Sequence, residues 1–313
     1  MARRCASALL ALLLFAAGAA LAAEPVVPAW LYPDNSPDGA SVSAVARVPG
    51  SQRRYSRAVL ADLYSGPDWH PASHDPMPQV VAHGRKPLVL ACGYCHTPGG
   101  QGRPENASLA GLPASYIVAQ VAGFKSGERR GAWPGRYLPT ELMIATAKAA
   151  SAEEIQAAAA YFAAQRPARC VRVLERERVP RARVVGLVYV AADGMEPLGE
   201  RLLEFAPDAR RHEDRDDALV YVAYAPIGSL ARGRELATAG SAPCVSCHGA
   251  ELEGLGAVPR LAGRSPTYLL RALWAFKTGA RGGPAALPMQ AVVAPLAGGE
   301  LIALSAYAAS LGP

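Results

Sequence analysis

Two short motifs carry the residues best suited to chemistry. Cys92-Gly93-Tyr94-Cys95-His96 and Cys244-Val245-Ser246-Cys247-His248 share the spacing C-x-x-C-H. Two thiols three residues apart on one helical turn can each add to a porphyrin vinyl group, and the adjoining histidine then lies under the ring and ligates its iron. The motifs therefore predict two covalently bound haem c groups. The residues predicted to bind them are Cys92, Cys95, His96, Cys244, Cys247 and His248.

A single C-x-x-C pair is also compatible with half of a zinc site or with a thioredoxin-like dithiol. A zinc site that combined both pairs would leave His96 and His248 unexplained, and the pairs lie 152 positions apart. By composition, one C-x-x-C-H arises by chance in roughly one such chain in several hundred, so two copies favour haem.

The motifs belong to an internal repeat with an offset of 152 residues. The matching positions are Leu109-Ala110-Gly111 with Leu261-Ala262-Gly263, Tyr116 with Tyr268, and Phe124-Lys125-Ser126-Gly127 with Phe276-Lys277-Thr278-Gly279. Further along, the offset falls to 146 residues, and Met143 and Met289 each precede a tyrosine by 18 positions. We interpret the chain as a duplication of one structural unit.

Helix signals surround these positions. Ser265-Pro266 is an N-cap and first-turn pair, and Gly279 can end the helix that follows. Ser151 and Glu154 form a capping box at the start of another helix. The counterpart of that second helix is expected to begin near Gly299. Each copy therefore predicts a small helical domain closed over its haem.

On these residues the chain resembles the class I cytochrome c family, and more closely the periplasmic dihaem cytochromes made of two fused class I domains. The resemblance covers roughly residues 80–165 and 229–312. It implies that each motif histidine is the proximal iron ligand and that a later methionine is the distal ligand, here Met143 and Met289. It also implies that a backbone carbonyl, from Ala107 or Pro259, orients each proximal imidazole.

The two methionines are not equally well marked. Met289 follows Leu287-Pro288, as is common in the family, whereas Met143 lacks a preceding proline. The alternative role of Met143 is that of a core methionine on a helix. Its repeat position favours the ligand assignment.

The N-terminus has the pattern of a secretory signal peptide. Arg3 and Arg4 precede an apolar run that ends in the small residues Ala20-Leu21-Ala22. Cleavage after Ala22 or Ala23 would deliver the protein to the periplasm, and the alternative is a retained N-terminal anchor. Removing the two arginines lowers the formal charge from +6 to +4. With no basic run that interleaves aromatic residues, the charge does not predict a nucleic-acid partner.

Residues 24–79 are rich in proline and are expected to form an extended arm with one short helix between Ser56 and Tyr64. Further possible iron ligands in and just beyond this arm are His70, His74, Met77 and His83. The alternative is that these are surface residues near proline turns, which is favoured if the methionines complete both coordination spheres.

Residues 168–228 separate the two copies and are rich in β-branched and aromatic residues. The expected strands are Val184 to Ala192, Glu200 to Phe205 and Leu219 to Ala225, and they predict a small antiparallel sheet. This insertion either recognises a redox partner or sets the distance between the haem domains. The leftover Cys170 is expected to be a buried apolar residue rather than a ligand.

Cationic residues follow both Phe-Lys-x-Gly steps. They are Lys125, Arg129, Arg130, Lys277 and Arg281. They could attract an acidic partner or neutralise haem propionates, and the alternative is solvated charges at helix ends.

The predicted fold is mainly α: two class I cytochrome c helical domains, a small inserted antiparallel β region and a Pro-rich N-terminal arm. The predicted divisions are 1–23, 24–79, 80–167, 168–228 and 229–313. The predicted function is a periplasmic dihaem carrier between a dehydrogenase and an oxidase or another cytochrome, with redox proteins as partners and membrane contact only through them. The alternatives are a dihaem oxidoreductase with one substrate-accessible haem, or a cytochrome subunit of a dehydrogenase complex.

Overall fold

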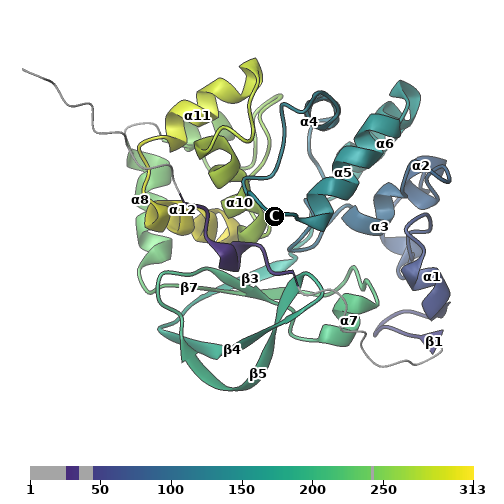
Figure 1. The fold of residues 1–313 in the computed structure, drawn as a ribbon, viewed down its shortest axis with the longest axis horizontal. Helices are drawn as coiled ribbons and strands as arrows, with labels where there is room; N and C mark the ends of the chain where they lie inside the picture. Colours follow the sequence, from purple (N-terminus) through teal and green to yellow (C-terminus); the bar gives the residue numbers. More distant parts are fainter. Residues whose placement is uncertain (1–25, 35–44, 241–242) are drawn as a thin grey trace, which may run out of the picture.

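The computed structural model describes residues 26–34, 45–240 and 243–313. Two groups of helices lie above a five-stranded sheet, the first group in blue and teal and the second in green and yellow (Figure 1). The expected signal peptide at residues 1–23 lies outside the described residues. Within the described part, no single helix is long and apolar enough to cross a membrane. One pair of consecutive helices, Pro284–Val293 and Gly298–Ser310, has sufficient length and apolar composition when taken together, but the pair is bent by 109°.

The first helical group contains the first C-x-x-C-H motif. Its helices are α2 (Gln79–Ala82), α3 (Cys92–His96), α4 (Ala114–Ser126), α5 (Leu138–Ala149) and α6 (Ala152–Ala164). The capping box predicted at Ser151 and Glu154 is confirmed, since each side chain accepts a backbone N–H of the other residue. Gly127 ends α4 in the left-handed region, at φ +86°. Helices α4 and α6 enclose an apolar core in which Phe162 is fully buried.

The second helical group contains the second motif. Its helices are α8 (Ser229–Ala239), α9 (Val245–His248), α10 (Pro266–Lys277), the short η3 (Pro284–Ala286), α11 (Leu287–Val293) and α12 (Gly298–Ser310). Ser265 caps α10 as predicted, accepting the Tyr268 N–H at 3.2 Å. Helix α8 packs closely on α12 because Gly233 has no side chain, and a Cβ there would lie 2.1 Å from the Ala303 carbonyl oxygen.

The inserted sheet has the strand order β3-β7-β6-β5-β4. Its strands are β3 (Val171–Glu175), β4 (Arg178–Val185), β5 (Val188–Pro197), β6 (Leu203–Phe205) and β7 (Tyr221–Ala225). β4/β5 and β6/β7 pair antiparallel, but β3/β7 and β5/β6 pair parallel, so the expectation of an antiparallel sheet is wrong for half of the pairings. Side-chain alternation predicts a strand but not the direction of its neighbour, which depends on how the chain connects the two strands.

One expected strand is in fact a hairpin. The stretch from Val184 to Ala192 contains the end of β4, a two-residue turn and the start of β5, with Val185 opposite Val188. Gly186 supplies the positive φ of +59° that such a tight turn needs. The charged run that follows β6 contains a short helix, α7 (Ala209–Glu213).

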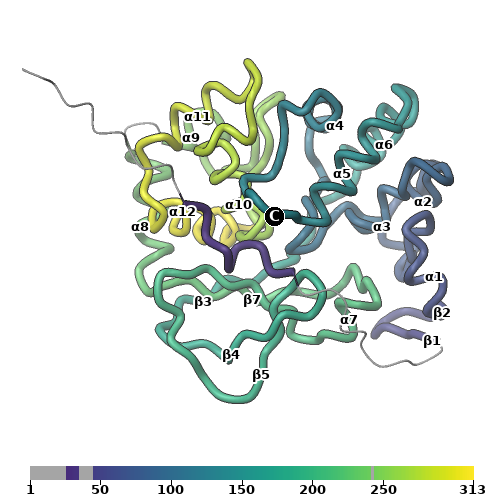
Figure 2. Tube along the Cα trace, in the orientation of Figure 1, coloured from purple at the N-terminus to yellow at the C-terminus, as the bar shows by residue number. Residues whose placement is uncertain are grey.

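The N-terminal arm contacts both the sheet and the second helical group. Its elements are η1 (Ala29–Leu31), β1 (Val45–Ala46), β2 (Tyr55–Ser56), α1 (Arg57–Ala61) and η2 (Pro71–Ser73). Helix α1 lies where the sequence predicts one. Leu31 and Tyr32 pack with Leu202 and Leu270, so the dark purple segment in Figure 2 runs between the sheet and the second group.

Glu204 lies on β6, where the inserted sheet contacts the start of α10, and it should make the stability of the fold depend on pH. Its buried Oε2 accepts hydrogen bonds from Ser265 Oγ at 2.6 Å and from the Thr267 N–H at 3.3 Å. Burial raises the pKa of Glu204, although these hydrogen bonds and Arg271 oppose the shift. The folded state therefore holds the proton more tightly than the unfolded chain. The stability from this group is present below the unfolded pKa of ~4.3 and is lost as pH rises through the folded pKa.

We expect Glu204→Gln to reduce the fall in the thermal unfolding midpoint between about pH 5 and pH 8, because the variant has no proton to lose in that range. Circular dichroism melts at a series of pH values measure this slope. Glu200→Gln, at an exposed position, is the control and should keep the slope of the parent protein. A Glu204→Gln slope equal to that of the parent would contradict the expectation.

Candidate functional site

The first C-x-x-C-H motif forms the short helix α3. His96 Nδ1 lies 2.8 Å from the Ala107 carbonyl oxygen, as the sequence predicts. This hydrogen bond holds the ring with Nε2 available to a metal. Burial lowers the pKa of His96, with the Ala107 hydrogen bond opposing the shift. The imidazole is therefore kept neutral, the state in which it ligates iron.

Met143 lies on α5 and lines the same cavity as Cys92, Cys95 and His96. The cavity is partly open, and the empty space within it and at its mouth, open solvent included, is about 1580 Å³. Its walls are mostly apolar and are formed by α4, α5 and α6 together with α10. The structure thus brings together all four residues that the sequence singles out in the first copy.

The polar groups of this cavity fit a flat apolar ring with an acidic edge. Four lining residues have a buried polar atom with no hydrogen-bond partner among the described residues: Tyr32 Oη, Glu105 Oε2, Tyr137 Oη and Arg264 Nε. Three of these are donors or can act as donors. Arg129, Arg271 and Arg281 line the cavity as well. Apolar walls with an excess of buried cations match a haem with two propionates.

The two helical groups meet through a reciprocal exchange of hydrogen bonds. Arg129 Nη2 donates to Tyr268 at 3.1 Å, and Arg281 Nη2 donates to Tyr116 at 2.9 Å. In the repeat, Arg129 corresponds to Arg281 and Tyr116 to Tyr268. The arginine of each copy therefore donates a hydrogen bond to the tyrosine of the other copy. Gln120, which has no counterpart, accepts from both arginines, at 2.9 and 2.5 Å. The sites of the two copies therefore share this interface.

Each of these arginines also packs on an aromatic ring of its own copy. The Arg129 guanidinium lies 4.5 Å from the centre of the Phe124 ring, and the Arg281 guanidinium lies 4.3 Å from that of Phe276. Burial raises the pKa of Tyr268, but Arg129, Arg264 and Arg281 outweigh it and lower the pKa to about 7. Three guanidinium groups therefore surround Tyr268 and concentrate positive charge at this interface.

Sequence reasoning found part of this interface and missed the rest. Arg129 and Arg281 were among the candidates for propionate contacts, whereas Lys277 instead donates to the Ala294 carbonyl at 2.6 Å. Tyr116 and Tyr268 stood out in the sequence only as repeat positions. Their conservation between the two copies was the one available signal of a shared role.

In the second copy, His248 Nδ1 lies 2.7 Å from the Pro259 carbonyl oxygen, again as predicted. Burial lowers the pKa of His248 as well, with the Pro259 hydrogen bond opposing the shift. Cys244 packs against a cluster that includes Leu269 and Ala308, and Cys247 is exposed.

Met289 is half-buried on α11, in a different environment from Cys244. It packs against the apolar cluster that contains Trp274 and Val293. The structure therefore places the two halves of the predicted second site in neighbouring clusters, which both draw on α10 and α12.

The remaining candidates lie away from the first cavity. His74 Nε2 lies 3.1 Å from Asp68 Oδ1, and Met77 packs in the core of the first group. Neither these two nor His70 and His83 are among the residues that line the cavity in the described part of the chain. Cys170, predicted to be a buried apolar residue, is only partly buried and packs against the apolar cluster of the inserted sheet. Burial raises the pKa of its thiol to about 12.

Comparisons with known proteins point to one family, although no protein-family model matches the chain. Cytochrome c-554(547) from Halothiobacillus neapolitanus is 38% identical over 96 residues, which are 27% of this chain and 98% of that protein. Cytochrome c4 from Azotobacter vinelandii is 27% identical over 70% of this chain and 83% of its own length. The thiosulfate dehydrogenase electron acceptor of Thiomonas intermedia is 28% identical over 63% of this chain and 67% of its own length.

Two solved structures also align. Reduced cytochrome c4 from Pseudomonas stutzeri has a TM-score of 0.44 at 22% identity and covers 70% of this chain and 93% of that one. Thiosulfate dehydrogenase TsdBA from Marichromatium purpuratum has a TM-score of 0.46 at 29% identity, and the match spans 71% of this chain and 37% of that one. With 38% identity across nearly all of cytochrome c-554(547) and a second copy of the motif downstream, the chain belongs to the class I cytochrome c family, as a dihaem electron-transfer cytochrome with two covalently bound haem c groups.

Proposed function

We propose that this protein carries electrons in the periplasm, from a dehydrogenase to an oxidase or another cytochrome. The signal peptide at residues 1–23 would direct export, and contact with the membrane would occur only through partners. A thiosulfate dehydrogenase is the first donor to consider, because the relative from Thiomonas intermedia is named as the electron acceptor of such an enzyme.

The observation that carries the proposal is the cavity that His96 and Met143 share with Cys92 and Cys95. In the proposed site, the two cysteines would attach the ring, and His96 and Met143 would ligate its iron. Haem supplies the one-electron couple, and methionine ligation raises its potential. A histidine and a methionine together leave no iron position for a substrate, which favours a carrier over an enzyme.

The second site is proposed by the same logic, with Cys244 and Cys247 for attachment and His248 and Met289 as ligands. The two haem domains would be residues 80–167 and 229–313, with residues 24–79 as the arm. The Arg129–Tyr268 and Arg281–Tyr116 hydrogen bonds support a fixed relation between the two sites. Residues 168–228 would then act as a support that packs under both domains.

Carbon monoxide tests whether either iron is open. We expect the reduced protein at neutral pH to bind carbon monoxide slowly or not at all. Two protein ligands would occupy the coordination positions that the porphyrin leaves open on each iron. Stopped-flow absorbance after mixing with carbon monoxide measures this. Met143→Leu is the positive control and should bind one equivalent rapidly, because leucine has no sulfur to ligate iron.

Rapid stoichiometric binding by the parent protein would instead favour the oxidoreductase alternative. Variants that lack one attachment motif would then show which of the two irons is open. If binding disappears when Cys244 and Cys247 are replaced, the open iron belongs to the second site, where Met289 lies in a different cluster from Cys244.

A further inference from the structure

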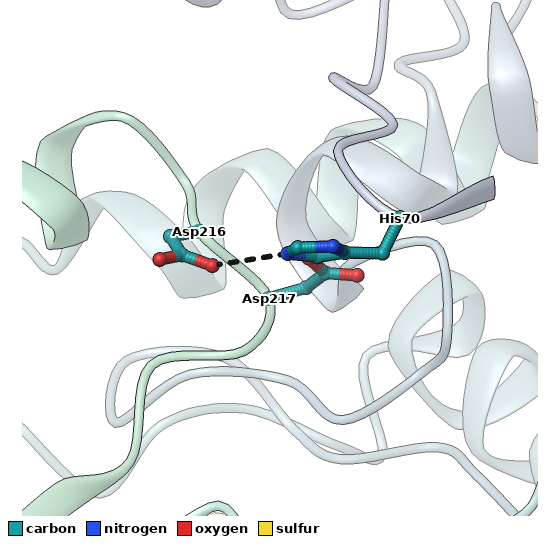
Figure 3. A group of neighbouring side chains, drawn as sticks. All are labelled: His70, Asp216 and Asp217. Carbon is teal, nitrogen blue, oxygen red and sulfur yellow. Dashed lines mark ion pairs between the residues drawn. The ribbon is translucent and has the colours of Figure 1, made fainter. Parts of the chain in front are cut away.

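Three side chains with metal-binding groups meet where the N-terminal arm touches the inserted sheet. His70 immediately precedes η2, and Asp216 and Asp217 lie in the turn between α7 and β7 (Figure 3). One ligand atom from each residue lies within 4.8 Å of the other two. None of the three lines the haem cavity, so the electron-transfer proposal does not use them.

The two distances from the imidazole nitrogen match the spacing of ligand atoms around an ion. His70 Nε2 lies 3.6 Å from Asp216 Oδ1 and 3.6 Å from Asp217 Oδ1. These separations exceed the ~2.7–3.2 Å of a hydrogen bond to nitrogen. Around a tetrahedral zinc ion with bonds of ~2.1 Å, neighbouring ligand atoms are roughly 3.4 Å apart.

Two of the three ligand atoms are buried without a hydrogen bond to any residue that the structure describes. These atoms are His70 Nε2 and Asp217 Oδ1. The Asp217 side chain is only 7% exposed, and Figure 3 shows it pointing toward the imidazole. Such a buried oxygen without a partner destabilises the fold, and a bound cation would satisfy it.

The third group is held in place but keeps a free lone pair. Asp216 is fully buried, and its Oδ2 accepts from Arg211 Nε at 2.5 Å. Its Oδ1 accepts the Ala218 N–H at 3.0 Å, and a carboxylate oxygen can bind a second group. Arg211 offsets one of the two carboxylate charges and leaves the other to be compensated.

A rigid support presents His70 to the turn. The preceding residue, Trp69, is 1% exposed, and its indole Nε1 donates to the Asp214 carbonyl at 2.7 Å. Arg57 from α1 forms an ion pair with the Asp214 carboxylate. The arm and the turn are thus fastened on one side of the cluster, which holds the three ligand atoms at their spacing.

We propose that His70, Asp216 and Asp217 bind a divalent cation of the zinc class, which ties the N-terminal arm to the inserted sheet. One imidazole and two carboxylates are a donor set that Zn²⁺ accepts readily. The competing state is a protonated His70 that forms an ion pair with both aspartates.

Zinc itself is the probe. The protein with both haems attached is dialysed against a chelator, freed of it, and titrated with Zn²⁺ by equilibrium dialysis. We expect one equivalent to bind with no change in the visible spectrum of the haems. His70→Gln and the isosteric Asp217→Asn should each weaken binding by at least about 100-fold.

His74→Gln is the matched control, because His74 also faces a carboxylate but does so at the hydrogen-bond distance of 3.1 Å to Asp68. It should keep the affinity of the parent. As a second measurement, Zn²⁺ should raise the thermal unfolding midpoint of the parent and of His74→Gln, but not of the two ligand variants. The proposal is overturned by the absence of saturable binding, by parental affinity in His70→Gln or Asp217→Asn, or by haem spectra that change in step with the zinc added.

Discussion

Replacing Cys244 and Cys247 with alanine is expected to leave a protein with one covalently bound haem instead of two. The attachment requires a thioether from each thiol, and the two sulfurs of this motif have no substitute within α9. Denaturing mass spectrometry of periplasmic material measures the change directly: the parent should show the mature chain plus two haem masses, and the double variant the chain plus one. The corresponding pair Cys92 and Cys95 should give the same loss at the first site.

Cys170→Ala is the control for this experiment. Cys170 is a free thiol whose Sγ lies 3.7 Å from the Gly263 carbonyl oxygen, and it lies in neither motif. The variant should therefore retain two haems. A parent protein with one haem, or a Cys244 and Cys247 double variant that still has two, would contradict the assignment of the second attachment site.

Met143→Leu is expected to give the second largest effect. Leucine matches methionine in volume, so the fold should lose less than about 1.5 kcal/mol, but the iron loses its sulfur ligand. The potential of one haem should then fall on the order of 100 mV, a modest part of the ~0.8 V range over which axial ligands act. A spectroelectrochemical titration resolves the two haems, and Met289→Leu should lower the other one.

Met77→Leu provides the matched control for Met143→Leu. Met77 packs in the apolar core of the first group, where its sulfur would lie 3.6 Å from a Cβ at Gly93, and it does not line the cavity. Its replacement should leave both potentials unchanged. If Met143→Leu also changes neither spectrum nor potential, then Met143 is a core residue and the distal ligand lies elsewhere.

Local sequence was sufficient to predict the parts of each site that lie close together in the chain. A C-x-x-C-H motif sets its own geometry within one helical turn, and each carbonyl partner that the family resemblance implied lies 11 residues after its histidine. The capping box at Ser151 and the N-cap at Ser265 are equally local, since their partners are three residues away. Short sequence separation leaves few alternative arrangements, so residue type and spacing were enough.

The internal repeat also related residues that lie far apart in the chain. Because the two copies match at Tyr116 and Tyr268, and at Arg129 and Arg281, these positions were visible as equivalent. Their exchange across the interface was not visible, because a repeat shows which residues correspond but not which copy each one contacts. Only the tertiary contact between the segments that follow α4 and α10 reveals that each arginine binds the tyrosine of the other copy.

By itself, the sequence was enough to identify the cofactor, the duplication and the helical character, and to predict the residues that would bind haem in the proposed sites. Tertiary structure alone decided the strand directions of the insertion, the different environment of Met289 and the meeting of His70 with Asp216 and Asp217. The physical reason is chain separation: His70 and Asp217 are 147 positions apart, and no periodicity or capping rule relates such residues. Their contact follows from the burial of Trp69 and its hydrogen bond to Asp214, which bring two unrelated loops together.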